Sequence, residues 1–158
     1  MSVPDRQLVT DALKATLVAG TGKQVGDHKA PLDAVSPYCV LHVVAGGRFW
    51  GAPLIAPDAQ ADFVFQVDAV SGPVRDANGQ IVTKATRKQA EWMADRVRRS
   101  VLARTSTGAF QVALTPPTGW IVADRAPDGG AGGVQVEGVP PNEVFSVAER
   151  FVLRVVPA

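Results

Sequence analysis

A chain of 158 residues, of which 46% are apolar and 20% charged, is long enough for one domain with a conventional core, so a disordered protein is excluded. The net charge of +1 excludes strong overall attraction to nucleic acid or to an anionic membrane, and any such binding has to be local. The single cysteine, Cys39, excludes an intrachain disulfide, and neither a signal peptide nor a membrane span is expected.

A helix is predicted over residues 5–19. Ser2 is the expected N-cap, Pro4 stands where the first helical turn tolerates proline, and Asp5 suits the positive end of the helix dipole. Apolar and small residues then recur at helical spacing until two glycines stop the run: Leu8, Ala12, Leu13, Thr16, Leu17, Gly20 and Gly22. Residues 21–37, with their Gly, Pro and Asp, are predicted to form a loop.

Two strands are predicted in the next part of the chain. Residues 38–45 are almost all apolar and rich in β-branched side chains, as in a strand that is covered on at least one face. Residues 48–51 are expected to form a turn or a short strand end. Apolar and polar positions alternate in 62–70, which predicts a half-exposed strand whose inner side carries Phe63, Phe65, Val67 and Ala69.

A hairpin and a second helix follow these strands. Residues 73–85 are predicted to insert a β-hairpin, because the pair Asn78-Gly79 favours a type I′ turn between two short strands. Thr86 is the expected N-cap of a helix over residues 87–104. Opposite charges four residues apart support this helix, and the expected pairs are Arg87 with Glu91 and Asp95 with Arg99.

The rest of the chain is predicted to be mostly strand. Short strands are expected at 110–114 and 120–123, and a flexible glycine-rich loop at 128–133. A long strand is expected at 145–156, with one face formed by Phe145, Val147, Phe151, Leu153 and Val155. The element order predicts one α+β domain, residues 1–158, with a mainly antiparallel sheet, two helices packed on one face and the hairpin insertion.

Residues that could carry catalysis or hold a metal do not form a known pattern. The run 20–23 (GTGK) lacks the earlier glycine of a phosphate-binding loop and follows a helix instead of a strand. Cys39 and His42 stand three apart on a predicted strand, so they point to opposite faces. His28 beside Asp27 has no serine in a nucleophile motif to complete a triad. We expect no enzyme, no cofactor and no metal.

In the second predicted helix, the largest apolar side chain, Trp92, does not lie on the apolar stripe. At about 100° per residue, Trp92 points to the opposite side, among Lys88, Arg96 and Arg99. The stripe itself consists of Ala90, Met93, Ala94, Val97 and Val101. Because Trp and Arg are favoured interface anchors, we predict that this side is a contact surface. The alternative is that Trp92 packs beneath a loop of its own chain.

Six residues are the candidate contacts with another subunit or a partner: Trp92, Arg96, Arg99, Trp50, Asn78 and Gly79. The many arginines of the second helix are also compatible with phosphate binding. However, Glu91 and Asp95 are interleaved with them, which favours a salt-bridged solvated or interface helix.

Three segments together resemble a known family of structural proteins. They are AVSG at 69–72, TRKQAEWMADRVRRSVL at 86–102, and VFSVAERFVLRVVP at 144–157. This order resembles the tail terminator proteins of long non-contractile-tailed (siphovirus) phages of actinobacterial hosts, in which a helix of the form T-R-x-Q-A-x-W-x-A-D-R-V-R follows a strand almost directly. Here the predicted hairpin at 73–85 separates the two.

The resemblance implies a structural virion protein that forms a hexameric ring, caps the tail tube, ends tail polymerisation and joins the tail to the head. Its expected partners are further copies of itself, the major tail tube protein and the head-tail connector or stopper protein. Genomic DNA would pass through the lumen without sequence-specific binding. The expected location is the head-proximal end of the tail in the virion, after assembly in the host cytoplasm.

Three other functions stay open from the sequence. The first is a head-to-tail connector or stopper (head completion) protein, which would also form a ring but would contact other partners. The second is a small α+β ligand-binding or enzymatic domain, for which convergent polar groups in a pocket are expected. The third is a nucleic-acid-binding protein that uses the second helix.

Overall fold

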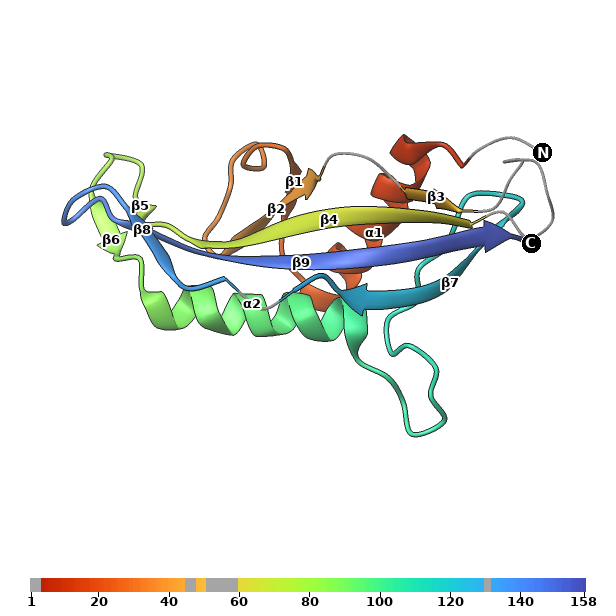
Figure 1. Cartoon of the computed structure of the whole chain (residues 1–158). Coiled ribbons are helices and arrows are strands. Elements are labelled where there is room, and N and C mark those ends of the chain that lie inside the picture. Colours follow the sequence, from red (N-terminus) through yellow and green to blue (C-terminus); the bar gives the residue numbers. More distant parts are fainter. Residues whose placement is uncertain (1–3, 45–47, 51–59, 130–131) are drawn as a thin grey trace.

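A long, twisted sheet runs the length of the molecule, and the computed structural model describes it in residues 4–44, 48–50, 60–129 and 132–158 (Figure 1). The predicted α+β class is confirmed. The elements are α1 (Arg6–Thr21), β1 (Val25–Asp27), β2 (Tyr38–Val43), β3 (Arg48–Trp50), β4 (Gln60–Ser71), β5 (Val74–Arg75), β6 (Ile81–Thr83), α2 (Arg87–Leu102), β7 (Trp120–Pro127), β8 (Gln135–Glu137) and β9 (Val144–Pro157).

The main sheet is antiparallel except at one edge. Its strand order is β1-β2-β4-β9-β7, and only the short β1 runs parallel to its neighbour β2. The longest strands, β4 and β9, form the centre and pair over most of their length, with Phe65 opposite Phe151. β3 pairs with β4 and β8 pairs with β9, outside this order. The predicted hairpin is a separate two-stranded sheet formed by β5 and β6.

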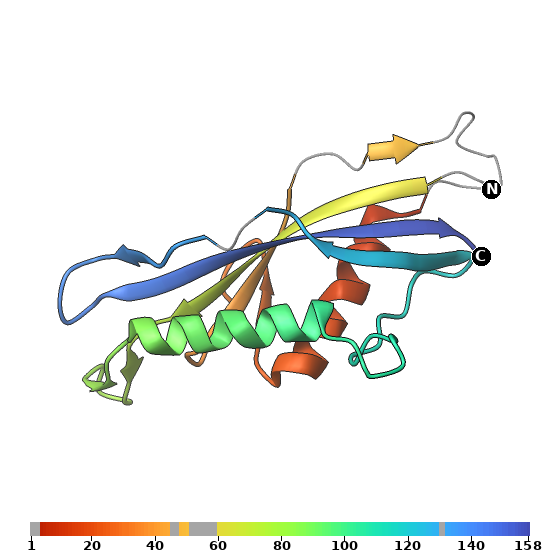
Figure 2. The ribbon, with the colours of Figure 1, turned by 60° about the horizontal axis from the view of Figure 1, so that its bottom comes forward.

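Side chains along β4 and β9 alternate between the two faces of the sheet, and the hydrophobic core lies on one of these faces. Most odd-numbered side chains of β4 and β9 are buried there, and Phe65 and Phe151 are fully buried. Both helices cover this face, as predicted (Figure 2). They contribute the buried side chains Val9, Leu13, Leu17, Ala90, Met93, Ala94, Val97 and Val101.

The other face of the sheet carries paired polar side chains. Arg154 donates two hydrogen bonds to the carboxylate of Asp62, at 2.9 and 3.1 Å. Arg150 donates to the amide oxygen of Gln66 at 3.1 Å. These pairs satisfy polar groups that are partly removed from water, so the face needs no covering layer.

The first helix begins and ends later than the sequence predicts. Asp5, and not Ser2, is the N-cap, because its carboxylate accepts the N–H of Gln7 at 2.8 Å. Gly20 lies within the helix, which ends at Thr21, and the C-cap Gly22 takes a left-handed φ of 66° that stops the helix there. None of the described helices is long and apolar enough to cross a membrane.

Gly20 allows the two helices to approach each other closely. A Cβ on Gly20 would lie 2.2 Å from Ser100 Oγ and 2.4 Å from Ser100 Cβ, so any larger residue forces α1 and α2 apart. We expect Gly20→Ala to reduce the free energy of unfolding by about 1–3 kcal/mol through overpacking. Chemical denaturation of the variant measures this. Adding Ser100→Gly removes both clashing atoms and is expected to restore part of the loss; no recovery would contradict the close approach.

Three further predictions were wrong in their local detail. The loop at 21–37 contains the strand β1, and 110–114 is not a strand, since Phe110 forms only an isolated bridge with Arg104. The hairpin turn is not type I′, because among its residues only Gly79 has a positive φ, of 79°. The Asp76 carboxylate holds a different turn by accepting the N–H groups of Asn78 and Gln80, both at 2.9 Å.

The predicted glycine-rich loop at 128–133 lies only partly in the described structure. Gly130 and Ala131 are outside the described residues. On either side of them, the Asp128 N–H donates to Arg150 O at 2.9 Å and the Gly132 N–H to Ala148 O at 3.1 Å. The flexibility of this loop stays a prediction.

Candidate functional site

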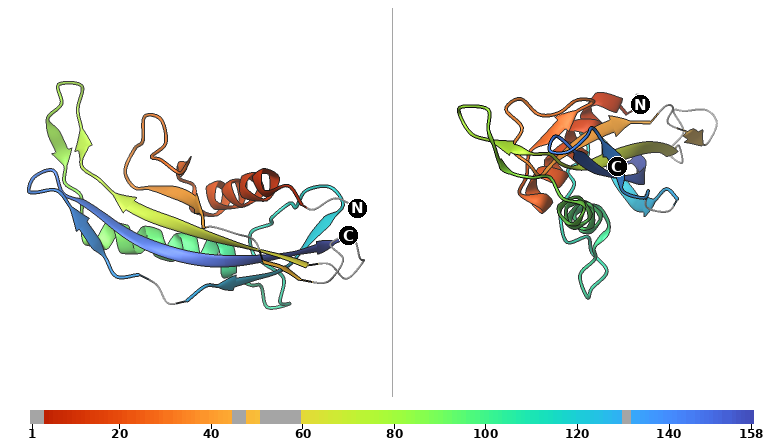
Figure 3. Two further views of the ribbon diagram at one scale, coloured as in Figure 1. Left: turned by 45° about the horizontal axis from the view of Figure 1, so that its top comes forward. Right: turned by 90° about the vertical axis from the view of Figure 1, so that its left-hand side faces the viewer.

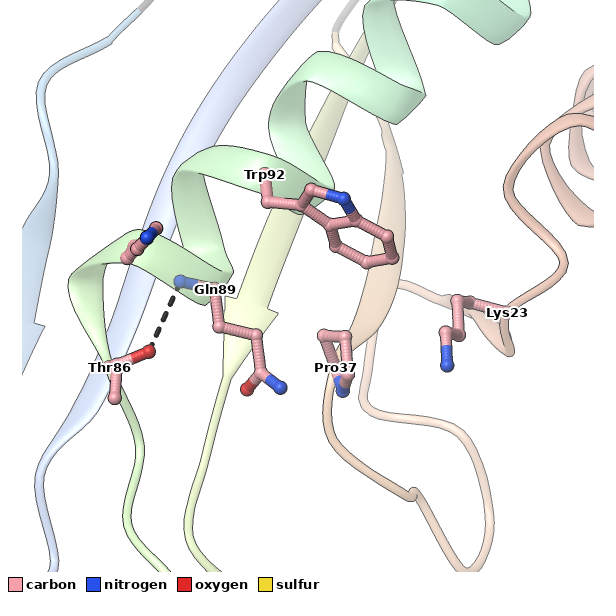
Figure 4. A pocket seen from close by; sticks show the side chains of 6 residues that line it. Lys23, Pro37, Thr86, Gln89 and Trp92 are labelled. Carbon is pink, nitrogen blue, oxygen red and sulfur yellow. Dashed lines mark hydrogen bonds between the residues drawn. The ribbon is translucent and has the colours of Figure 1, made fainter.

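Trp92 lies on the surface of α2 between two hollows. Its side chain is turned toward Pro37, with Lys23 across the first hollow (Figure 4). This hollow has a volume of about 400 Å³ and is lined by Lys23, Pro37, Thr86, Lys88, Gln89 and Trp92. A second hollow of about 320 Å³ is lined by Gly20, Trp92, Arg96, Arg99, Ser100, Gln111 and Val112. Trp92 is the residue that the two hollows share.

The exposure of Trp92 fits neither a core residue nor a fully solvated one. The residue is 43% exposed, whereas Met93 and Val97 of the same helix are fully buried. The Arg96 guanidinium lies 4.9 Å from the centroid of the indole, within the range of a cation–π interaction. Because Trp is enriched among interface anchors, an indole that is held in place by a cation but left open to solvent is a candidate contact residue.

A hydrogen-bond network holds Gln89, which lines the first hollow. The side-chain oxygen of Gln89 accepts from Ser71 Oγ at 2.7 Å and from Ser36 Oγ at 3.3 Å. Ser71 Oγ accepts the N–H of Thr86 at 3.1 Å, and Ser36 Oγ accepts the N–H of Gly72 at 2.9 Å. The network joins the start of α2, the end of β4 and the loop before β2, so the position of Pro37 relative to Trp92 is fixed.

Four cations border these hollows: Lys23, Lys88, Arg96 and Arg99. In the part of the chain that the structure describes, none of them forms an ion pair. Together with Trp92 and Pro37 they form what we call the Trp92 surface. Aromatic and apolar groups surrounded by uncompensated positive charge favour a partner that is apolar at its centre and acidic at its edge.

Other charges of α2 are compensated within the chain. Arg87 lies 3.6 Å from Glu91, as predicted. The predicted pair of Asp95 with Arg99 was wrong, because the Asp95 carboxylate lies 3.9 Å from Arg98 instead. Arg98 also contacts the buried carboxylate of Glu149 at 2.6 Å. Arg99 is therefore left on the Trp92 surface without an acidic partner among the described residues.

The structure brings three of the six candidate contact residues together. Trp92, Arg96 and Arg99 line the second hollow. Asn78 and Gly79 lie at the turn of the β5–β6 hairpin, beyond the first turn of α2 at one end of the molecule (Figure 1). Trp50 ends β3, and its side chain lies outside the described residues.

Sequence reasoning missed the parts of this surface that come from loops. Lys23 and Pro37 both belong to 21–37, and Gln111 and Val112 belong to the segment between α2 and β7. No periodicity marks such residues, because a loop has no repeating face. Only the tertiary packing of loops against α2 shows their role.

The cysteine and histidines occupy different faces of the sheet. Cys39 is fully buried in the core, while the His42 imidazole on the other face lies 3.1 Å from Asp68. His28 lies 3.6 Å from Asp27, and its ring centroid is 5.5 Å from that of His42. Among the described residues, no three His, Cys, Asp or Glu side chains are grouped to hold a metal ion.

Burial keeps the Cys39 thiol protonated. It raises the pKa of Cys39 from 9.0 to about 12, and the charge of Asp68 adds to the effect. Because the folded pKa exceeds the unfolded one, this group's contribution to stability is complete below pH 9 and decreases as the pH rises toward 12. We expect iodoacetamide at pH 8 to leave native Cys39 unmodified and to alkylate it in denaturant, which mass spectrometry measures. Fast alkylation of the native protein would contradict this burial.

No protein-family model matches the chain, and no curated protein matches it.

Proposed function

We propose that this protein is a ring-forming structural protein of a phage virion, a tail terminator. In this role it caps the head-proximal end of the tail tube, ends tube polymerisation and connects the tail to the head-side connector. The segments 86–102 and 144–157 support the proposal by their resemblance to tail terminator proteins. The first of them forms α2 and the second forms β9, so the resembling residues build one helix and one central strand.

The observation that carries the proposal is the Trp92 surface. In an isolated subunit, an exposed indole bordered by four cations that pair with no described carboxylate is unfavourable on balance, because self-repulsion and exposed apolar area both cost free energy. A subunit that assembles covers such a surface. Repeated contacts between two different patches close into a ring when the rotation between subunits closes.

Tube growth stops when a protein binds the growing end with one face and does not offer the same binding surface on its other face. Such an end presents unpaired edges and apolar patches that invite further subunits. A terminator binds this end and presents a different face to the head. The near-neutral net charge of +1 is compatible with a lumen through which DNA passes without being held by its phosphates.

The test is genetic and visual. A phage that lacks this protein is expected to give filled heads separate from tails, and the tails should have abnormal length or unjoined ends in electron micrographs. Supplying the wild-type protein from a plasmid should restore complete particles. Normal, head-joined tails in its absence would contradict the proposal. Tails of normal length that only fail to join heads would indicate a connector or stopper instead.

A further inference from the structure

A second exposed patch lies at the end of the molecule where β8 turns into β9. β8 pairs with the start of β9, and the turn between them, residues 138–143, lies at the tip of the sheet beside the β5–β6 hairpin (Figure 3). Val136 is 52% exposed and Val139 is 72% exposed. Glu137 and Glu143 form no ion pair with any described residue. We call residues 135–143 the acidic arm.

The acidic arm has a fixed shape. Its turn is closed by a hydrogen bond from the Asn142 N–H to Val139 O at 2.8 Å. Gly138 has a φ of 83°, and a Cβ there would lie 2.9 Å from Asn142 O, so only glycine fits. The guanidinium of Arg75 donates to the Asn142 side chain and ties the arm to the hairpin. An arm shaped before binding loses little conformational entropy when it docks.

The acidic arm and the Trp92 surface are complementary in charge and in polarity. The arm presents Glu137 and Glu143 beside two exposed valines, and the surface presents four cations around Trp92 and Pro37. None of these charged groups forms an ion pair with a described residue. We infer that the acidic arm of one copy docks on the Trp92 surface of the next copy. Val139 then contacts the indole, and Glu137 faces the cations beside it.

This docking specifies the lateral contact of the proposed ring, and it rests on that proposed function. The two patches differ from each other, so the contact is head-to-tail and each copy offers one arm and one surface. A chain of such contacts leaves both patches satisfied only when the ring closes. Copies of this chain alone can therefore close the ring, and no other protein is needed to compensate the four cations.

Charge reversal tests the contact in the full chain. Glu137→Lys and Lys88→Glu, made separately, each place like charges opposite one another and are expected to weaken self-association by about tenfold or more. The two substitutions combined in one chain restore opposite charges, so the double variant should recover most of the wild-type association. Asp11→Lys is the matched control, because Asp11 is an exposed carboxylate on α1 outside both patches. Sedimentation equilibrium of each variant, with circular dichroism to verify folding, gives the comparison.

The outcomes separate this inference from the proposed function. If the wild type forms rings and both single variants form them equally well, the docking of the arm is wrong but the ring is not. The same conclusion follows if the single variants associate weakly and the double variant does not recover the association. Wild-type protein that stays monomeric up to about 1 mM, where even a weak contact of about −4 kcal/mol would show, overturns both. Equal weakening by Asp11→Lys would also overturn the inference, since the effect would then follow from net charge.

Discussion

Replacement of Trp92 by alanine is expected to weaken ring formation while the subunit stays folded. The side chain is 43% exposed, so much of the indole is still open to a partner. Truncating an interface anchor of this kind costs about 2 kcal/mol or more of association free energy, which is about thirtyfold in affinity. The loss is expected in sedimentation or light scattering, with an unchanged circular dichroism spectrum.

Ile121→Ala is the matched control for this substitution. Ile121 on β7 is 49% exposed, so it has a similar exposure but does not line either hollow. The control variant should assemble like the wild type. If Trp92→Ala instead melts far below the wild type and still assembles, Trp92 serves only the fold of its own chain, and the interface assignment is wrong.

Replacement of Arg125 by alanine is expected to cost roughly 3 kcal/mol of unfolding free energy. Arg125 is buried, and its guanidinium donates to Val112 O at 2.8 Å and to Val101 O at 3.4 Å. The same guanidinium stacks 4.2 Å from the centroid of Phe110. Burial, with a smaller effect from Arg104, lowers the pKa of Arg125. Removing the side chain leaves a cavity and two carbonyls with fewer donors.

Arg104→Ala is the control for the buried arginine. Arg104 stacks on the same Phe110 ring at 3.9 Å, but its side chain is half exposed. Its loss should cost less than half as much. Hydrogen exchange of 103–114 should increase sharply in Arg125→Ala, because Val112 and Phe110 lose their shared anchor. A variant as stable and as protected as the wild type would contradict the structural role of Arg125.

Long elements with a regular pattern could be predicted from the sequence. The strands predicted at 62–70 and 145–156 are β4 and β9, and the helix predicted at 87–104 is α2. In each, the alternation or the helical spacing repeats often enough to set both the element and its buried face. The exposed position of Trp92 could be predicted for the same reason, since it departs from a clear stripe.

Contacts between loops could not be predicted in this way. Phe110 looks like the start of a strand, but its ring is held instead by two guanidiniums, those of Arg104 just after α2 and of Arg125 on β7. Lys23 and Pro37 join the Trp92 surface only because 21–37 folds back beside α2. The acidic arm is missed because β8 is short and its exposed valines have no periodicity. In these places tertiary packing decides the conformation, and local sequence carries no signal of it.

The mass of the purified protein in solution tests most directly whether it functions by assembling. Sedimentation equilibrium or mass photometry over a range of concentrations is expected to show a closed species of about six times the 16.6 kDa subunit, and Trp92→Ala should shift it toward the single subunit. A wild-type protein that stays at 16.6 kDa at every concentration, with the same behaviour in the variant, would contradict the account.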